Sequence, residues 1–116
     1  MVTPSPATII VMPFPFSDLS GSKLRPAVVL ANAGRGDWVL CQITSNPYND
    51  PDAIRFTQTD LQQGSLNSVS FARPMKLFTA NESLMTKSVA ILNNDIFKAI
   101  LTATIGTLQK NIPQEL

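Results

Sequence analysis

Most of the chain consists of short apolar runs separated by clusters of Gly, Pro, Ser, Asn and Asp, a pattern typical of β-strands joined by turns. The first run, 8–16, opens with β-branched residues and predicts a strand. Pro13 and Pro15 have no N–H to donate to a sheet, so this strand is expected to end or lie at an edge there. Residues 17–23 are polar and predict an exposed, mobile loop.

Two continuous apolar runs, 26–31 and 38–43, are joined by a segment that contains two glycines, 32–37. Unbroken apolar strands on either side of a Gly-rich connection favour a buried antiparallel hairpin. The next segment, 45–52, contains Asn-Pro and Asp-Pro pairs and predicts a loop. Beyond it the pattern predicts a strand at 54–57, a turn or one helical turn at 60–64, and strands at 68–73, at 75–79 after a bend, and at 88–92.

The C-terminal segment differs because its apolar residues recur at helical spacing. Asn93, Asn94 and Asp95 are candidate N-caps, and a helix is predicted from about 95 to 110. Its apolar face would carry Phe97, Ile100, Leu101, Thr104, Ile105 and Leu108. Strands followed by one helix indicate a mostly β fold, a small barrel or sheet with a helix packed on it. The length of 116 residues suits one domain, 1–116.

The composition limits the kinds of chemical site that the chain can form. Histidine is absent and Cys41 is the only cysteine, which excludes an internal disulfide, a Cys/His zinc site and the His-dependent nucleophile pairs. The net charge of +1 argues against a strongly basic nucleic-acid clamp but allows a local basic groove. With no long apolar stretch and no basic segment before an apolar run, we expect a cytoplasmic protein without membrane contact and a reduced, buried Cys41.

The predicted hairpin would place Arg25 and Thr44 at the same end of neighbouring strands. A planar guanidinium beside a hydroxyl suits an oxyanion or a phosphate. The alternative is that Arg25 pairs on the surface with Asp18 or Asp60, while Thr44 only ends a strand.

Other basic residues would join this site only if their strands end on the same side. Arg73 precedes a proline at the end of a predicted strand, and Lys76 follows it closely. Tyr48, in a polar loop, is the best candidate to stack on a base. Phe14 and Phe16 share one face of their strand and are typical of a core or an interface.

Three segments together resemble a known family. Residues 13–30, in which Arg25-Pro26-Ala27 follows the polar loop, closely resemble the opening motif of the PemK/MazF toxins of type II toxin–antitoxin systems. Gln42-Ile43-Thr44-Ser45 resembles the second motif of that family, and residues 70–77 resemble the third. The similarity extends over about residues 7–110.

The resemblance implies an SH3-like β-barrel with a C-terminal helix, the fold of the CcdB, MazF and Kid plasmid-maintenance toxins, in a homodimer. It implies metal-independent, sequence-selective cleavage of single-stranded RNA without a cofactor. In that chemistry the ribose 2′-hydroxyl attacks the adjacent phosphate, and the products are a 2′,3′-cyclic phosphate (or 3′-phosphate) and a 5′-hydroxyl. A small acidic antitoxin would be the protein partner, covering Arg25 and the 17–23 loop.

Site residues follow from the same motifs. The resemblance implies that Arg25 stabilises the phosphorane and that Thr44 holds or polarises the phosphate. The full set it implies is Arg25, Thr44 and Arg73 in catalysis and Ser17, Asp18, Ser20, Lys23, Ser45, Asn46 and Lys76 in RNA binding.

The sequence departs from the family pattern at two places. Ala7-Thr8 stands where members commonly have Gly-Asp, and Met75 stands where the PemK branch often has an aspartate general base. Met75 cannot accept a proton, so the base lies elsewhere, with Asp18 the nearest acid by sequence, or the activity is weak. Since an arginine has a pKa of about 13, Arg25 is better suited to stabilise charge than to act as a base.

Two other functions stay open. One is a catalytically weak or inactive member that binds antitoxin or RNA. The other is a CcdB-type gyrase poison, although that family acts through a C-terminal Trp-Gly-Ile and this chain ends Ile-Pro-Gln-Glu-Leu.

Overall fold

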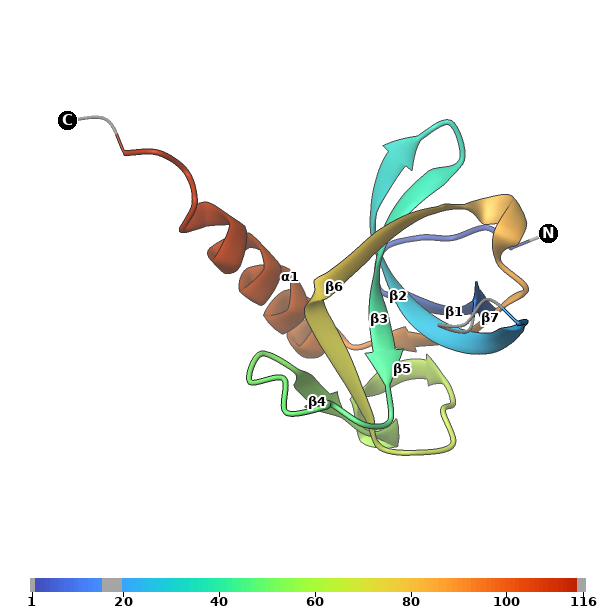
Figure 1. Ribbon diagram of the computed structural model, residues 1–116. Coiled ribbons are helices and arrows are strands. Elements are labelled where there is room, and N and C mark those ends of the chain that lie inside the picture. Colours follow the sequence, from blue (N-terminus) through green and yellow to red (C-terminus); the bar gives the residue numbers. More distant parts are fainter. Residues whose placement is uncertain (1, 16–19, 115–116) are drawn as a thin grey trace.

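Strands of one antiparallel sheet curl into a half-barrel, and a helix follows at the C-terminal end (Figure 1). The computed structural model describes residues 2–15 and 20–114. The order of the strands across the sheet is β4-β6-β3-β2-β1-β7-β5. The strands are β1 Thr8–Pro15, β2 Ser22–Gly34, β3 Asp37–Thr44, β4 Ile54–Phe56, β5 Leu61–Gly64, β6 Ser70–Asn81 and β7 Lys87–Leu92, and the helix α1 is Asn94–Gln109. Short 3₁₀ helices occupy Gln58–Asp60 and Glu82–Leu84.

Strands β2 and β3 form the predicted antiparallel hairpin. The predicted loop at 17–23 and turn at 32–37 were both too long, because β2 begins at Ser22 and continues to Gly34. The turn is reduced to Arg35 and Gly36, which both have positive φ, 57° and 81°. Such a two-residue turn matches the twist of the strands it joins. At the other end, the polar start of β2 is held by its pairing with β1, from Ser22 opposite Pro15 onward.

The prolines of β1 lie at an edge, as predicted. Strand β7 pairs with β1 only over Thr8–Val11, whereas β2 pairs along its whole length. Pro13 and Pro15 therefore fall in the part of β1 that has a partner on one side only. This leaves the start of β2 and the end of β1 as a two-stranded ribbon.

Strand β6 contains the bend predicted at Pro74. Four residues, Arg73–Lys76, stand opposite the single residue Gln42, between the pairs Ile43↔Ala72 and Cys41↔Leu77. The two strands predicted at 68–73 and 75–79 are therefore one strand with a wide bulge. Thr104 of α1 donates a hydrogen bond to the carbonyl of Pro74, with 3.1 Å between oxygens, so the helix holds the bulge.

The turn predicted at 60–64 is wrong. A 3₁₀ turn precedes it, and 61–64 form β5, which pairs with β7 from Leu61↔Leu92 to Gly64↔Ala90. This strand lies at the edge of the sheet, where polar side chains such as Gln62 and Gln63 remain in solvent. Because its sequence is polar, it lacks the apolar run that predicted the other strands.

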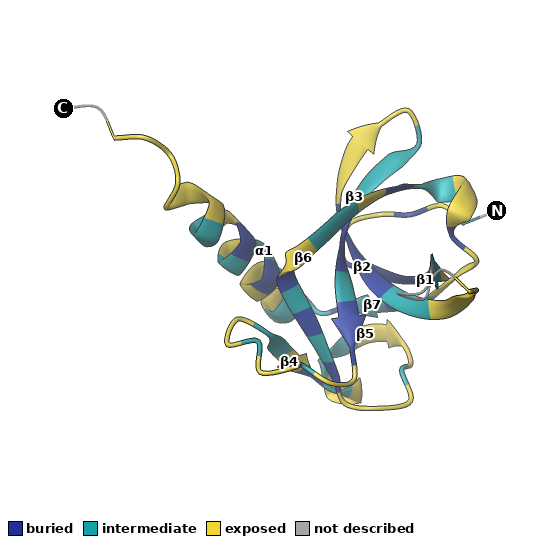
Figure 2. Cartoon of the chain, viewed as in Figure 1, coloured by how far each residue is buried: buried dark blue, intermediate teal, exposed yellow. Residues whose placement is uncertain are grey.

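The central strands are buried on both faces (Figure 2), since alternate side chains enter two different apolar clusters. Val28 and Cys41 belong to the cluster that α1 covers with Ile100, and Val29 and Leu40 belong to the other. The centre of the ladder that positions the end of the hairpin is thus shielded from water.

The predicted helix is confirmed to within one residue at each end. The Asn93 side chain caps it by accepting a hydrogen bond from the Ile96 amide at 2.9 Å. Its predicted apolar face is only partly buried, because the helix extends beyond the sheet (Figure 1). Ile105 and Leu108 are 57% and 53% exposed, and with Ile112 they form an apolar surface near the C-terminus, here named the helix-end patch. No helix within the described ranges is long and apolar enough to span a membrane.

We expect Gly64→Ala to lower stability more than Gly34→Ala. Both glycines have positive φ, 84° and 93°, so the backbone strain of alanine, about 1 kcal/mol or more, is common to both variants. Only at Gly64 would a Cβ meet backbone, namely the Val89 carbonyl oxygen and, at 2.6 Å, the Ala90 Cα. Overpacking of this kind adds about 1–3 kcal/mol. Urea unfolding measures the difference, and equal losses would contradict the close approach of β5 to β7.

Candidate nucleic-acid interface

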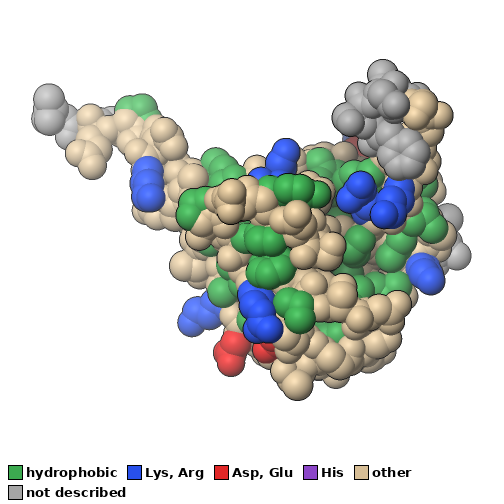
Figure 3. All heavy atoms as spheres, turned by 60° about the horizontal axis from the view of Figure 1, so that its bottom comes forward, with side chains coloured by type: hydrophobic (Ala, Val, Ile, Leu, Met, Phe, Trp, Pro, Cys, Tyr) green, Lys and Arg blue, Asp and Glu red, His purple; other side chains and the backbone are tan. Residues whose placement is uncertain are grey.

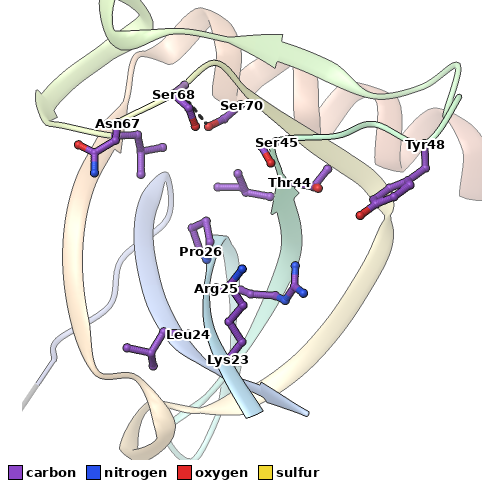
Figure 4. A pocket seen from close by; sticks show the side chains of 12 residues that line it. Lys23, Leu24, Arg25, Pro26, Thr44, Ser45, Tyr48, Asn67, Ser68 and Ser70 are labelled. Atoms are coloured by element: carbon purple, nitrogen blue, oxygen red, sulfur yellow. Dashed lines mark hydrogen bonds between the residues drawn. The ribbon is translucent and has the colours of Figure 1, made fainter. Parts of the chain in front are cut away.

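The end of the β2–β3 hairpin opens into a hollow of about 380 Å³ (Figure 4). Pairing of the two strands ends at Ala27↔Gln42, and two residues further on Arg25 and Thr44 both line the hollow. The hairpin therefore brings these two residues to one site, as predicted. The opposite wall comes from the segment before β6. The lining is Lys23, Leu24, Arg25, Pro26, Ile43, Thr44, Ser45, Tyr48, Leu66, Asn67, Ser68 and Ser70.

The charge of this lining comes from Lys23 and Arg25, and the part of the chain that the structure describes adds no Asp or Glu to it. Figure 3 brings this end of the molecule forward and shows Lys and Arg side chains beside hydrophobic ones, with the acidic side chains at one margin. Asp60, one of the two alternative partners of Arg25, instead accepts the Thr57 amide at 2.9 Å. Asp18, the other, lies outside the described residues, as does Ser17.

Thr44 is built into the loop that follows it. Its hydroxyl donates to the Asn46 carbonyl at 3.0 Å and lies 3.2 Å from the Asn46 amide, while the Asn46 side chain accepts the Tyr48 amide at 2.9 Å. These bonds hold Tyr48 at a φ of 53°, a left-handed conformation that costs a non-glycine residue about 1 kcal/mol or more. Its ring is 63% exposed at the rim of the hollow, as a stacking residue requires.

Arg73 lies outside this lining. Its Nε donates to the Asp50 carboxylate at 2.9 Å, and its guanidinium carbon is 6.0 Å from the centre of the Tyr48 ring. Both Arg73 and Lys76 belong to the β6 bulge. Arg73 is thus next to the hollow through Tyr48, over whose ring its guanidinium lies, and Lys76 has no part in the lining.

Of the remaining predicted residues, some line the hollow and others do not. Lys23 and Ser45 line the hollow, whereas Ser20 and Asn46 do not. The sequence reasoning missed the opposite wall, formed by Leu66, Asn67, Ser68 and Ser70. The signal for it was the polar run Ser65–Ser68 directly before a strand, a place where binding residues commonly lie.

Two sulfur side chains near the site offer little acid–base chemistry. Burial raises the pKa of the Cys41 thiol to about 12, opposed by a backbone hydrogen bond with Arg73, so the thiol stays protonated at neutral pH. Cys41 is a core residue, as expected. Met75 is 41% exposed on the bulge and has no titratable group.

The described segments contain no cluster of three or more His, Cys, Asp or Glu side chains arranged to hold a metal ion.

The fold has solved counterparts. The chain is similar to an endoribonuclease from a mycobacterial species in complex with its cognate antitoxin, with a TM-score of 0.72, 13% identity, and coverage of 96% of this chain and 100% of that one. It is also similar to a MazE–MazF complex from Deinococcus radiodurans (TM-score 0.75, 16% identity, coverage 94% and 98%). A third counterpart is the Mycobacterium tuberculosis toxin MazF-mt6 (TM-score 0.63, 13% identity, coverage 86% and 96%).

By sequence alone, no protein-family model and no curated protein matches the chain. The structural likeness, over nearly the whole chain, shows that it has the fold of the MazF toxins. The predicted fold class, a small β-barrel-like sheet with a C-terminal helix, is thereby confirmed.

The Asp50–Arg73 ion pair predicts a pH-dependent difference in stability. The hydrogen bond from the Arg73 side chain, followed by the Asp52 amide, lowers the pKa of Asp50 below its usual value. The stabilisation is therefore complete above the unfolded-state pKa near 4 and is lost as the pH falls through the lower folded-state pKa. We expect Asp50→Asn to lower stability at pH 7 by about 0.2–1 kcal/mol, with the difference from wild type vanishing in acid.

Thermal unfolding of both proteins between pH 7 and pH 2 measures this effect. Asp52→Asn is the matched control, since it removes a carboxylate from the same loop without removing an ion pair observed among the described residues. Equal stability of wild type and Asp50→Asn at pH 7 would contradict a contribution from the pair.

Proposed function

We propose that this chain is a PemK/MazF-family toxin of a type II toxin–antitoxin pair and that it cleaves single-stranded RNA. The motif resemblance supports this proposal, and so does the fold that it shares with MazF toxins over nearly its full length. The observation that carries it is the meeting of Arg25 and Thr44 in a polar hollow, where the charged side chains among the described lining residues are Lys23 and Arg25.

A phosphodiester fits the chemistry of this hollow. Its negative charge would lie near the Arg25 guanidinium and the Lys23 ammonium, with the hydroxyls of Ser45 and Ser68 beside them (Figure 4). The Thr44 and Ser70 hydroxyls donate to the carbonyls of Asn46 and Ser68, so each would have to exchange that hydrogen bond to donate to the phosphate. A base next to that phosphate would stack on the exposed ring of Tyr48. Double-stranded RNA lacks such splayed bases, so a single strand is the substrate.

The proposed reaction needs neither a metal nor a cofactor. The ribose 2′-oxygen forms a bond to the adjacent phosphorus, the bond from phosphorus to the 5′-oxygen breaks, and the 2′-proton leaves as the 5′-oxygen gains one. Negative charge grows on the non-bridging oxygens, where fixed donors such as Arg25 stabilise the transition state most. Binding on both sides of the phosphate holds the attacking and leaving oxygens in line.

Proton transfer has no carboxylate among the described lining residues. We infer that the proton acceptor is either a carboxylate outside these described lining residues, with Asp18 the nearest acid by sequence, or solvent. Solvent as the acceptor would make cleavage slow, in keeping with Met75 at the position where the PemK branch often has an aspartate.

Cleavage of an RNA panel in EDTA by the purified protein tests the proposal. We expect new 5′-hydroxyl ends and 2′,3′-cyclic phosphates, and a rate about 10²–10³ times lower for Arg25→Gln because one charge-stabilising group is lost. Arg35→Gln is the matched control, since Arg35 lies at the opposite end of the same hairpin.

Each alternative gives a different result. RNA that is bound but stays intact at high protein excess would identify an inactive, RNA-binding member of the family. RNA that is neither bound nor cut would overturn the proposal and leave the gyrase-binding poison.

An antitoxin with an acidic segment is the proposed protein partner. Two of the structural counterparts are complexes of a toxin with its antitoxin, or of MazE with MazF. A chain segment rich in Asp and Glu would be attracted to the positive lining at Lys23 and Arg25 and would keep RNA out.

A second copy of the chain is the proposed partner of the helix-end patch. Phe14, which was expected in a core or an interface, packs against the second apolar cluster and lies edge-to-face on Phe78, with ring centres 5.0 Å apart. Phe16 lies outside the described residues. Ile105, Leu108 and Ile112 remain exposed together on the helix side of the molecule. Contiguous exposed apolar side chains of this kind mark interfaces.

We expect Ile105→Glu to weaken a homodimer strongly, because a carboxylate would have to be buried without a partner. Sedimentation analysis over a range of concentrations measures the shift toward monomer. Thr102→Glu, on an exposed position of the same helix, is the control and should leave the dimer intact. A dimer unaffected by Ile105→Glu would exclude this surface, and a monomeric wild type would exclude the homodimer.

A further inference from the structure

The hollow lined by Arg25 and Thr44, here named the Arg25 hollow, adjoins a second hollow. Leu24, Leu66 and Asn67 line it on one side and also line the second hollow, of about 480 Å³. The far wall of this second hollow belongs to β7. Lys87, Ser88 and Val89 form it, and Val11 of β1 and Ser65, which follows β5, complete the lining.

A third hollow, of about 260 Å³, continues from the second along β7. The two share Ser88 and Val89, and the third is bounded by β5 through Gln63 and Gly64. The three hollows therefore follow one another from Tyr48 past Arg25 and Lys87 to the edge strand, and this series is here named the β7 groove. A single hollow accepts one phosphate, whereas a groove of this kind accepts a chain.

The charge along the β7 groove has one sign. Its cations are Lys23, Arg25 and Lys87, and none of the described residues that line the three hollows is Asp or Glu. Lys87 is exposed, and it forms no ion pair with a carboxylate in residues 2–15 or 20–114. In a protein whose net charge is only +1, this separation of charge creates a local positive field that follows a path.

The boundary between the first two hollows is apolar. Leu24, which is 53% exposed, stands on β2 and contributes to both hollows, as does Leu66 from the other side. An apolar surface between two cationic hollows suits a nucleobase whose flanking phosphates lie on either side. Asn67, which also lines both hollows, offers an amide donor and acceptor to the edge of such a base.

We propose that the Lys87 hollow is a second nucleotide subsite. An RNA strand whose scissile phosphate lies at Arg25 continues across Leu24 and Leu66, and its neighbouring phosphate meets Lys87. The proposal rests on the proposed RNA substrate, but it assigns to Lys87 a role that neither the motifs nor the Arg25 hollow implies. It also explains why the polar wall at 65–68 belongs to both hollows.

Binding of labelled RNA of increasing length tests this subsite. The probes are 2′-O-methylated pools of random sequence, from 2 to 12 nucleotides, which cannot be cleaved by attack of the 2′-oxygen. For wild type, affinity should rise with length until the β7 groove is filled. For Lys87→Ala, the longer probes should bind about fivefold more weakly while the dinucleotides are unaffected, because only the longer probes reach Lys87.

Salt dependence gives a second, independent readout. The slope of log K against log salt for long probes should fall by about 0.7 when one phosphate contact is lost from a single strand. Lys87→Arg, which keeps the charge, should restore both affinity and slope. Lys98→Ala removes a lysine from an exposed position on α1 and serves as the matched control.

The outcomes separate this inference from the proposed function. If Arg25→Gln weakens binding and cleavage but Lys87→Ala behaves like Lys98→Ala, the second subsite is overturned and the nuclease stands. If Lys87→Ala weakens probes of every length equally, Lys87 acts only through general charge, and the subsite is again overturned. If wild type neither binds nor cuts RNA, the proposed function itself fails.

Discussion

The antiparallel ladder between β2 and β3 is the interaction on which the rest of the structure depends. Four residues at its centre, Val28, Val29, Leu40 and Cys41, have no exposed surface, so the hydrogen bonds between the strands are shielded from competing water. Their side chains alternate between two apolar clusters, one of which is covered by α1. A shift of one residue would exchange every inward side chain, so the register is fixed. The relative position of Arg25 and Thr44 follows from that register.

Much of this arrangement was predictable because buried strands and amphipathic helices leave a periodic record in the sequence. The β2–β3 hairpin, the bend at Pro74 and the helix cap at Asn93 each have a local signal, and each is present. The misjudged elements lack such a signal. Strand β5 is polar because it lies at an edge, and the first residues of β2 are polar because their strand pairing depends on β1.

Some residues of the site could likewise be predicted from nearby sequence, whereas others depend on contacts that form only in the folded chain. Arg25 and Thr44 could be paired by counting residues outward from a turn. Nothing local predicts that Asp50 would hold Arg73 at 2.9 Å, 23 residues away in sequence, or that Tyr48 would be fixed in a left-handed conformation between them. Similarly, the wall at Leu66–Ser70 reaches the hollow only because the sheet curls. The sequence pattern around the hairpin therefore predicted the position of Arg25 and Thr44. The curvature of the sheet determined which residues surround them.

The hydrogen bond between Thr104 and Pro74 has a consequence for how this sequence can vary. A bulge leaves backbone carbonyls without strand partners, and Pro74 is fully buried, so its oxygen needs a donor from elsewhere. Thr104 offers one from the buried side of the helix, although its single proton is shared with the Ile100 carbonyl at 2.9 Å. Valine has nearly the same shape but would remove the hydrogen bond between the helix and the bulge, and leaving a buried carbonyl unpaired costs at most about 1–3 kcal/mol. A small hydroxyl at position 104 is thus favoured for as long as the irregularity in β6, thirty residues earlier, is retained.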